Sequence, residues 1–175
     1  MKSQATIYSS FRDIHWKTII PNADKTLDIV VYYWDTWTAQ NLPELKEFLA
    51  KPDTCIRFYF TDLNNPILAK QILELFPRNK SIDDLKQRIS ATYKPLQDFF
   101  KDTNLSPEKV MVYKIPRMLG YALQKIDDST AILAPFEMYR SLQHVDAPAF
   151  MVDLQKNQSV KLFCEKELIA MRQAQ

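Results

Sequence analysis

Glycine is almost absent from this chain, because Gly120 is the only one among 175 residues. Loops that cradle phosphate groups need glycines so that the backbone can come close to the ligand. A P-loop and a Rossmann G-x-G-x-x-G turn are therefore excluded, and with them the commonest nucleotide-dependent enzymes. Histidine is also scarce, with only His15 and His144. A mechanism that needs several histidines would have to take them from a partner chain.

Cysteine occurs only as Cys55 and Cys164, which lie far apart in apolar runs. Such residues are typical of buried thiols in a reducing compartment, and the spacing indicates neither a disulfide nor a zinc site. The first ten residues lack the apolar segment of a signal peptide, and no apolar run is long enough to span a membrane. We therefore expect a cytoplasmic protein, and no motif indicates a cofactor or a metal.

Charge of one sign is not in large excess, since 23 basic and 21 acidic residues give a net charge of +2. No strong field toward nucleic acid or membranes is implied, although a local basic patch remains open. Hydrophobic residues make up 46% and charged residues 25% of the chain, which is typical of a globular protein. The length predicts one domain over residues 1–175.

Apolar runs and helical periodicity alternate along the chain. Runs of β-branched and aromatic residues predict strands, and apolar residues three and four apart predict helices. Residues 11–23 have the pattern of a short amphipathic helix or an extended arm, and Pro95 should kink or end the helix in which it lies. The expected strands are 27–34, 55–61, 106–115, a hairpin over 120–138 and 147–154; the expected helices are 41–51, 65–77, 81–100 and 159–173.

This order predicts an α/β fold. Strands separated by helices are expected to pair in parallel through right-handed crossovers, and the hairpin adds antiparallel strands. We therefore expect a mixed, largely parallel sheet with helices on both faces. The strands at 27–34 and 55–61 are apolar on both sides, so they should be parallel neighbours in the centre of the sheet.

The hairpin stretch "GYALQKIDDSTAILAPFEM" reads as a strand, a turn at Asp127-Asp128 and a second strand. An ordinary hairpin would also contain such an aspartate-rich turn. Its arrangement, with the strand–helix units before it, resembles the phospholipase D-like superfamily, which carries H-x-K-x4-D on a hairpin, often followed by G-S-x-N. Aligned on this turn, Gly120 takes the place of the family's histidine and Ala122 that of its lysine, while the aspartate is retained as Asp127. The Gly-Ser pair becomes Ala134-Pro135, and the asparagine becomes Glu137.

The resemblance implies a phospholipase D-like fold without the family's chemistry. In the family the histidine attacks phosphorus and the lysine stabilises the phosphoryl oxygens. Gly120 and Ala122 can do neither, and no histidine lies between His15 and His144 to replace them. What remains is a non-catalytic module, regulatory or sensory, that binds a phosphate-bearing ligand (a nucleotide or a nucleic acid) or a protein partner.

The resemblance also implies a homodimer, because single-motif members of the family pair across a two-fold axis. Such pairing is in any case the commonest kind of oligomer. The hairpin over 120–138 should then lie near the axis, with packing from Tyr121, Leu133, Phe136 and Met138. The alternative is a monomer in which these residues belong to the core.

A second candidate site follows from the strand ends. In sheets of this type ligands bind beyond the carboxyl ends of parallel strands. Asp35 and Asp62 follow the first two strands, and Trp34 lies beside them. The two carboxylates could form the centre of an active hydrolase or transferase that holds a metal, a sugar or a base. Alternatively, each aspartate caps the helix that follows it.

Other side chains could serve a ligand at the hairpin. Lys114, Arg117 and Lys125 could hold an anion, and the tryptophans of the first quarter could stack bases or form the core. His15 beside Asp13 could act as a base, although a surface position is more typical of such a pair. A third hypothesis is an assembly subunit whose aromatic surfaces pack against copies of itself. The candidate binding residues are Trp34, Asp35, Asp62, Arg117, Tyr121, Lys125 and Asp127.

Overall fold

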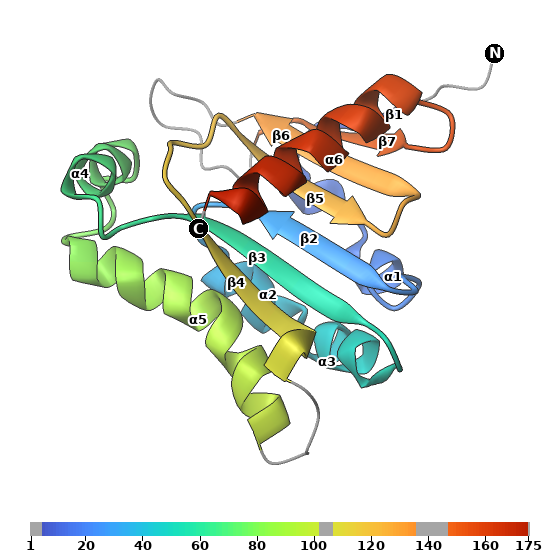
Figure 1. The fold of residues 1–175 in the computed structure, drawn as a ribbon, viewed down its shortest axis with the longest axis horizontal. Helices are drawn as coiled ribbons and strands as arrows, with labels where there is room; N and C mark the ends of the chain where they lie inside the picture. Colours follow the sequence, from blue (N-terminus) through green and yellow to red (C-terminus); the bar gives the residue numbers. More distant parts are fainter. Residues whose placement is uncertain (1–4, 102–106, 136–146, 175) are drawn as a thin grey trace.

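The computed structural model describes residues 5–101, 107–135 and 147–174. In this part of the chain, seven strands form one sheet in the order β1-β7-β6-β5-β2-β3-β4 (Figure 1). The strands are β1 (Ala5–Tyr8), β2 (Thr26–Val30), β3 (Cys55–Thr61), β4 (Val110–Ile115), β5 (Tyr121–Ile126), β6 (Thr130–Pro135) and β7 (Ala149–Asp153). The helices are η1 (Phe11–Asp13), α1 (Trp16–Ile19), α2 (Asp35–Gln40), α3 (Leu42–Ala50), α4 (Pro66–Leu75), α5 (Ile82–Lys101), η2 (Pro107–Lys109) and α6 (Gln158–Gln173).

The centre of the sheet is as predicted. Strands β2 and β3 are parallel neighbours, with Leu27 opposite Ile56 and Ile29 opposite Phe58. Strand β5 flanks β2 and strand β4 flanks β3, so neither lies at an edge. Their apolar residues are buried on both faces, which explains why this pairing could be inferred from composition.

The sheet is mixed, as predicted, but its parallel part is smaller than expected. Strand β3 pairs in parallel with β2 and with β4. The other four pairings are antiparallel. Strand β5 runs antiparallel to β2, and β6, β7 and β1 extend this side of the sheet, each antiparallel to its neighbour.

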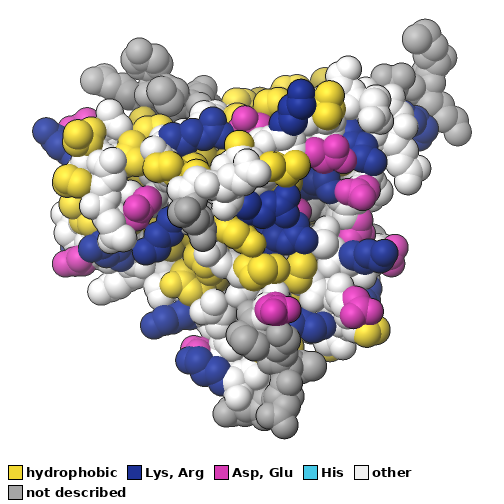
Figure 2. Space-filling model, in the orientation of Figure 1, with side chains coloured by type: hydrophobic (Ala, Val, Ile, Leu, Met, Phe, Trp, Pro, Cys, Tyr) yellow, Lys and Arg dark blue, Asp and Glu magenta, His cyan; other side chains and the backbone are white. Residues whose placement is uncertain are grey.

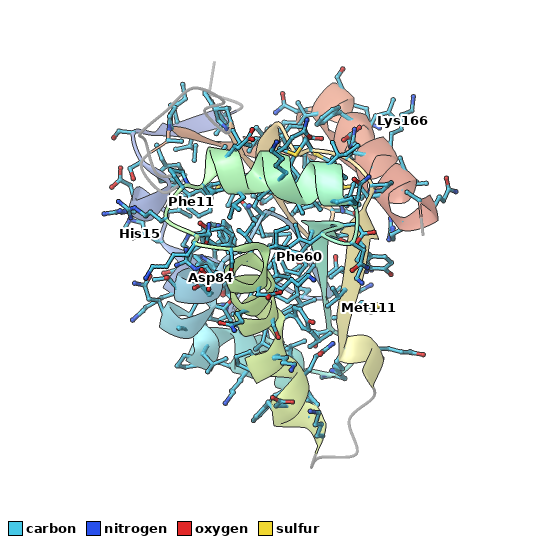
Figure 3. The ribbon with its side chains drawn as sticks, turned by 90° about the vertical axis from the view of Figure 1, so that its left-hand side faces the viewer. Phe11, His15, Phe60, Asp84, Met111 and Lys166 are labelled. Carbon is cyan, nitrogen blue, oxygen red and sulfur yellow. The ribbon has the colours of Figure 1, made fainter. Side chains whose placement is uncertain are left out.

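Helices cover both faces, which confirms the predicted layers. Helix α6 lies on one face, and α1, α2 and α3 lie on the other (Figures 1 and 3). Side chains alternate along β2: Leu27 and Ile29 join the apolar cluster of the α1–α3 side, whereas Val30 joins the cluster under α6. Helix α5 contributes to both clusters, with Leu85 on the α6 side and Leu96 on the other.

Three local features differ from the sequence-based expectation. Helix α5 continues through Pro95 to Lys101, so of the two expected effects of this proline, a kink or an end, the end is wrong. Leu96 and Phe100 are buried just beyond it, and their packing against the core holds the following turn in the helix. Strand β1 and helix α2 were not predicted. Strand β1 has only four residues, with a mixed burial pattern, and therefore gives a weak periodic signal.

The tryptophans of the first quarter belong to the core. Trp34 and Trp37 lie with ring centroids 4.5 Å apart, and Phe11 lies 4.9 Å from Trp34. All three rings are buried in the cluster of the α1–α3 side, so they are not a surface for stacking bases. No helix in the described ranges is both long enough and apolar enough to cross a membrane. Cys164 is buried, Cys55 is half-buried, and both are free thiols.

Candidate functional site

The predicted hairpin is present, and it carries the positions of the family motif. Strands β5 and β6 pair with Ala122 directly opposite Ala134. Gly120 is exposed just before β5, and a Cβ added there would meet no atom within 4 Å. Pro135 is exposed at the end of β6, and Glu137 lies outside the described residues.

The lysine position of the motif is closed. Ala122 has 0% of its surface exposed. It belongs, with Ala134 and Trp34, to the apolar cluster on the α1–α3 side. A charged side chain there would be surrounded by core residues and could not reach solvent without displacing them.

The aspartate that was aligned with the family motif has a clear structural contact. The Asp127 carboxylate accepts hydrogen bonds from the backbone N–H groups of Asp24, Lys25 and Thr26, each at 2.8 Å. Asp127 itself has a φ of 49°, a left-handed conformation that aspartate tolerates better than most residues. It therefore fastens the hairpin turn to the start of β2.

The two strand-end aspartates lie where expected but make separate contacts. Asp35 is in the first turn of α2 and forms an ion pair with Arg88, with Nε–Oδ2 at 3.0 Å. Asp62 accepts a hydrogen bond from the backbone N–H of Asn64 at 3.0 Å, which closes a turn. Trp34, which precedes Asp35 in the chain, is buried. Within the described residues no group of three His, Cys, Asp or Glu side chains is placed to hold a metal ion.

Arg117 and Tyr121 are brought together by a residue that sequence reasoning missed. Glu167 of α6 accepts hydrogen bonds from Arg117 Nη2 at 2.5 Å and from the Tyr121 hydroxyl. Burial of Glu167 opposes ionisation, but the bonds from Tyr121 and Arg117 outweigh it and lower the pKa of its carboxyl. Burial and the bond to Glu167 raise the pKa of Tyr121.

The backbone before Gly120 is held by a second tyrosine. The Tyr32 hydroxyl donates to the carbonyl of Leu119 at 2.7 Å and accepts from its N–H at 2.9 Å. Burial raises the pKa of Tyr32 to about 12, so the hydroxyl stays neutral. The approach to the motif position is thus fixed by a buried side chain from the end of β2.

The predicted binding residues divide between two ends of the sheet. Arg117 and Tyr121 lie at the end where β2 and β3 finish, near the strand-end aspartates. Lys125 and Asp127 lie at the other end, because β5 runs antiparallel to β2. Lys125 is almost buried and donates to the carbonyl of Asp127 and, at 2.6 Å, to Asp128 Oδ1. Arg117 and Lys125, which were proposed to hold the same anion, therefore lie at opposite ends of the sheet.

A charged cleft lies at this second end. It has a volume of about 360 Å³ and is bounded by α6, the hairpin turn and the beginnings of β2 and β3. Figure 2 shows Lys and Arg side chains gathered in the middle of this face, beside α6, with acidic side chains around them. We call it the α6 cleft, and its basic residues are Lys25, Arg57, Lys125 and Arg172.

The floor of the α6 cleft is a charged row across three strands. Asp28 stands opposite Arg57 on β3 and opposite Lys125 on β5. Only 2% of Asp28 is exposed. Its carboxylate accepts bonds from Arg57 Nη1 at 3.1 Å and from the Tyr59 hydroxyl at 2.7 Å. Buried carboxylates need such partners because losing water is costly for a charge.

Asp28 and Arg57 were missed, although a signal was present. Each is a charged residue inside a run of apolar residues, "LDIVVYYW" and "CIRFYF". The register places both side chains on the α6 face, one strand apart. The two strands were predicted to be parallel neighbours, and their opposite charges stand at similar positions along each strand. This pattern would have indicated a cross-strand ion pair.

Solved structures share this arrangement of elements. TrmBL2, an archaeal chromatin protein that shows a novel mode of DNA binding, is 10% identical with a TM-score of 0.55 over 100% of this chain and 54% of its own. NucT from Helicobacter pylori is 12% identical with a TM-score of 0.57 over 97% of this chain and 96% of its own. A phosphatidylserine synthase from Haemophilus influenzae is 14% identical with a TM-score of 0.56 over 93% of this chain and 36% of its own.

The fold is phospholipase D-like, as these likenesses show. The chain spans about half of the TrmBL2 chain and about a third of the phosphatidylserine synthase. No protein-family model matches the sequence, and no curated protein matches it.

Proposed function

We propose that this chain is a non-catalytic phospholipase D-like module that binds a phosphate-bearing ligand. The observation that carries the proposal is the hairpin itself: the fold is present, and Gly120 and Ala122 stand where the family has its histidine and lysine. The motif aspartate survives as Asp127, whose carboxylate is bonded to backbone amides.

The surroundings of the motif support the loss of catalysis. Gly120 offers no nucleophile, and Ala122 is fully buried, so a neighbouring cation cannot take the place of the missing lysine. His15, the histidine in the described ranges, is exposed and precedes α1, apart from the hairpin in sequence and in the sheet. His144 lies outside the described residues.

Two features support a phosphate-bearing ligand. TrmBL2, which has this fold, shows a novel mode of DNA binding, so the architecture is compatible with phosphate groups when it is used for binding. The face of the sheet that carries α6 presents basic side chains in a cleft. Arginine in particular offers paired N–H donors that match the oxygens of phosphate.

The test combines turnover and binding on the same purified protein. Phosphodiester lipid, single-stranded DNA and RNA are incubated without added metal, and the products are separated. Binding is measured by titration with AMP, single-stranded DNA and vesicles that contain an anionic phospholipid. We expect binding of at least one of these probes and no cleavage.

Two results would contradict the proposal. The first is robust hydrolysis that survives both His15→Ala and His144→Ala, because a different catalytic centre would then be at work. The second is the failure of every phosphate-bearing probe to bind, which would leave the module without its ligand class.

A further inference from the structure

We propose that the α6 cleft is the phosphate site and that its ligand is a compact phosphomonoester of nucleotide size, gripped by Arg57 and Arg172. This inference rests on the proposed function, and it places the site at the end of the sheet opposite to Gly120 and Ala122. The family's catalytic position and the binding site would then be different places on the same domain.

The two arginines have donors to spare. Arg57 uses Nη1 for Asp28, and in the part of the chain that is described its Nη2 and Nε have no hydrogen-bond partner. Arg172 Nε donates to the carbonyl of Leu168 at 3.1 Å within its own helix. Its two Nη atoms have no partner among the described residues. Each guanidinium can therefore present two N–H groups to a phosphate oxygen pair.

Arg57 and Arg172 both line the α6 cleft, and both act on the hydroxyl of Tyr59. Burial and the Asp28 carboxylate raise the pKa of Tyr59, whereas the charges of Arg172 and Arg57 lower it. Arg57 comes from β3 and Arg172 from the last turn of α6, so two distant segments bring positive charge to the same cleft. Asp28 pairs with Arg57, whereas Arg172 has no ion pair among the described residues and keeps its charge for a ligand.

The other carboxylates of the cleft are already engaged. The Asp127 oxygens accept three backbone N–H groups. Asp128 pairs with Lys125 at 2.6 Å, and Glu165 lies 3.9 Å from Lys161. Asp127 is held by backbone N–H groups and the other two carboxylates by lysines, so none of the three forms an ion pair with Arg57 or Arg172 among the described residues.

The same carboxylates favour a small ligand over a polymer. Asp128 and Glu165 stand at the rim with side chains 75% and 39% exposed. A nucleic-acid backbone that continued past the rim would bring further phosphates close to these charges, which costs free energy. A ligand with a single terminal phosphate would place its negative charge only at the floor of the cleft, away from these carboxylates. The volume of about 360 Å³ is within the range of small-molecule sites.

The lining also suits the organic part of such a ligand. Leu168 and Ile169 of α6 form an apolar wall beside the basic floor, and Ile169 is exposed to solvent. Ligand sites in proteins combine such apolar walls with a few polar anchors. A phosphomonoester with a base or a sugar attached could place its phosphate at the arginines and its ring against these two residues.

The experiment compares three proteins with matched charge changes. Calorimetric titration with AMP is run on the unaltered chain, on Arg172→Gln and on Lys166→Gln. Lys166 belongs to the same helix but lies on its outer side, away from the sheet (Figure 3). Adenosine, which lacks phosphate, and single-stranded DNA are titrated in parallel, and thermal melting shows that each variant is folded.

We expect Arg172→Gln to weaken AMP binding by roughly tenfold to a hundredfold, the effect of losing charged hydrogen bonds. Lys166→Gln should keep the affinity of the unaltered chain, and adenosine should bind far more weakly than AMP. Amide signals of Thr26 and Leu168 should shift in nuclear magnetic resonance spectra when AMP is added.

The possible failures are distinguishable. Equal AMP affinity in Arg172→Gln and the unaltered chain would overturn the site in the α6 cleft while the proposed function stands. Binding of DNA without binding of AMP would overturn the compact ligand and again leave the proposed function. If no phosphate-bearing probe bound at all, both proposals would be wrong.

Discussion

Asp127 and Thr26 are joined by two hydrogen bonds that run in opposite directions. The N–H of Thr26 donates to Asp127 Oδ1 at 2.8 Å, and the N–H of Asp127 donates to the carbonyl of Thr26 at 2.9 Å. The residues are about a hundred positions apart in the chain. Asp127 thereby connects the hairpin turn to the central strand β2.

This clamp predicts a loss of stability when its acceptor is removed. Asp127→Ala should lower the free energy of unfolding by about 2–4 kcal/mol, because three backbone N–H groups lose a charged acceptor and alanine is strained at positive φ. Asp127→Asn should lose roughly half as much, since asparagine tolerates this conformation and keeps one acceptor oxygen. Urea denaturation measures both values. Equal, small losses in the two variants would contradict a clamp.

Introducing the family's histidine at position 120 and its lysine at position 122 should affect stability differently. Gly120→His should fold normally, because the added side chain points into open space. Ala122→Lys should destabilise by about 3 kcal/mol or more, since it places a charge in a closed apolar cluster. Thermal melting of both single variants checks this. An Ala122→Lys variant that is folded and equally stable would show that position 122 can reach solvent.

The buried carboxylate at the floor of the α6 cleft should be sensitive to its charge. Asp28→Asn should lower the free energy of unfolding by about 2–4 kcal/mol, because it breaks a largely buried pair and leaves Arg57 without a counter-charge. If the cleft binds AMP, the same variant should bind it more tightly, since the competing carboxylate is neutral. Chemical denaturation and calorimetry measure the two effects, and Asp153→Asn at the surface is the control.

The ionisation of Glu167 makes the stability of the fold depend on pH. The bonds from Tyr121 and Arg117 hold the pKa of Glu167 below its ordinary value, so ionised Glu167 stabilises the fold above that ordinary value. This stabilisation is lost as the pH falls through the lowered pKa. Glu167→Gln should therefore cost about 1 kcal/mol at neutral pH, and the difference from the unaltered chain should shrink below about pH 4.

Melting temperatures measured from pH 7 down to about pH 3 test the Glu167 effect. Glu74→Gln is the matched control, because Glu74 is an exposed residue of α4 in a weak pair with Lys70. A difference between Glu167→Gln and the unaltered chain that stays constant over the whole range would contradict the electrostatic origin.

The predicted homodimer remains open to test. Tyr121 is half-buried and its ring lies 5.9 Å from that of Phe163 on α6, while Leu133 is half-buried on β6. Phe136 and Met138 lie outside the described residues. Light scattering over a range of concentrations should give the mass of two chains, and Phe163→Ser should shift it toward one. A constant monomer mass at high concentration would contradict the dimer.

Much of the fold could be predicted because its signals are local. Apart from Asp28 and Arg57, the runs at 27–30 and 55–61 carry apolar residues toward both faces, and only a central strand buries both faces. The helix expected over 65–77 is observed as α4 (Pro66–Leu75), within two residues at each end. The aspartate-rich turn predicted the hairpin, since tight turns select a few residue types. These patterns depend on neighbours within about ten positions.

The site could be predicted only in part, because its contacts join distant segments. Arg117 and Tyr121 were each predicted to be binding residues, but Glu167, which contacts both, is about 50 positions away on a helix whose placement no local pattern determines. Pro95 remained inside α5 because Leu96 and Phe100 pack against the core. Here tertiary packing outweighed the local preference of proline.

The sequence by itself determined most of the strands and helices, including the central pair β2 and β3 and the hairpin of β5 and β6. Only the tertiary structure decided that Asp28 meets Arg57 and Lys125, that Arg172 returns to the same point from the end of α6, and that the cleft opens away from Gly120. The physical reason is register. Moving one strand by a single residue turns its side chains to the other face, and register is set by packing of the whole sheet rather than by any stretch of sequence.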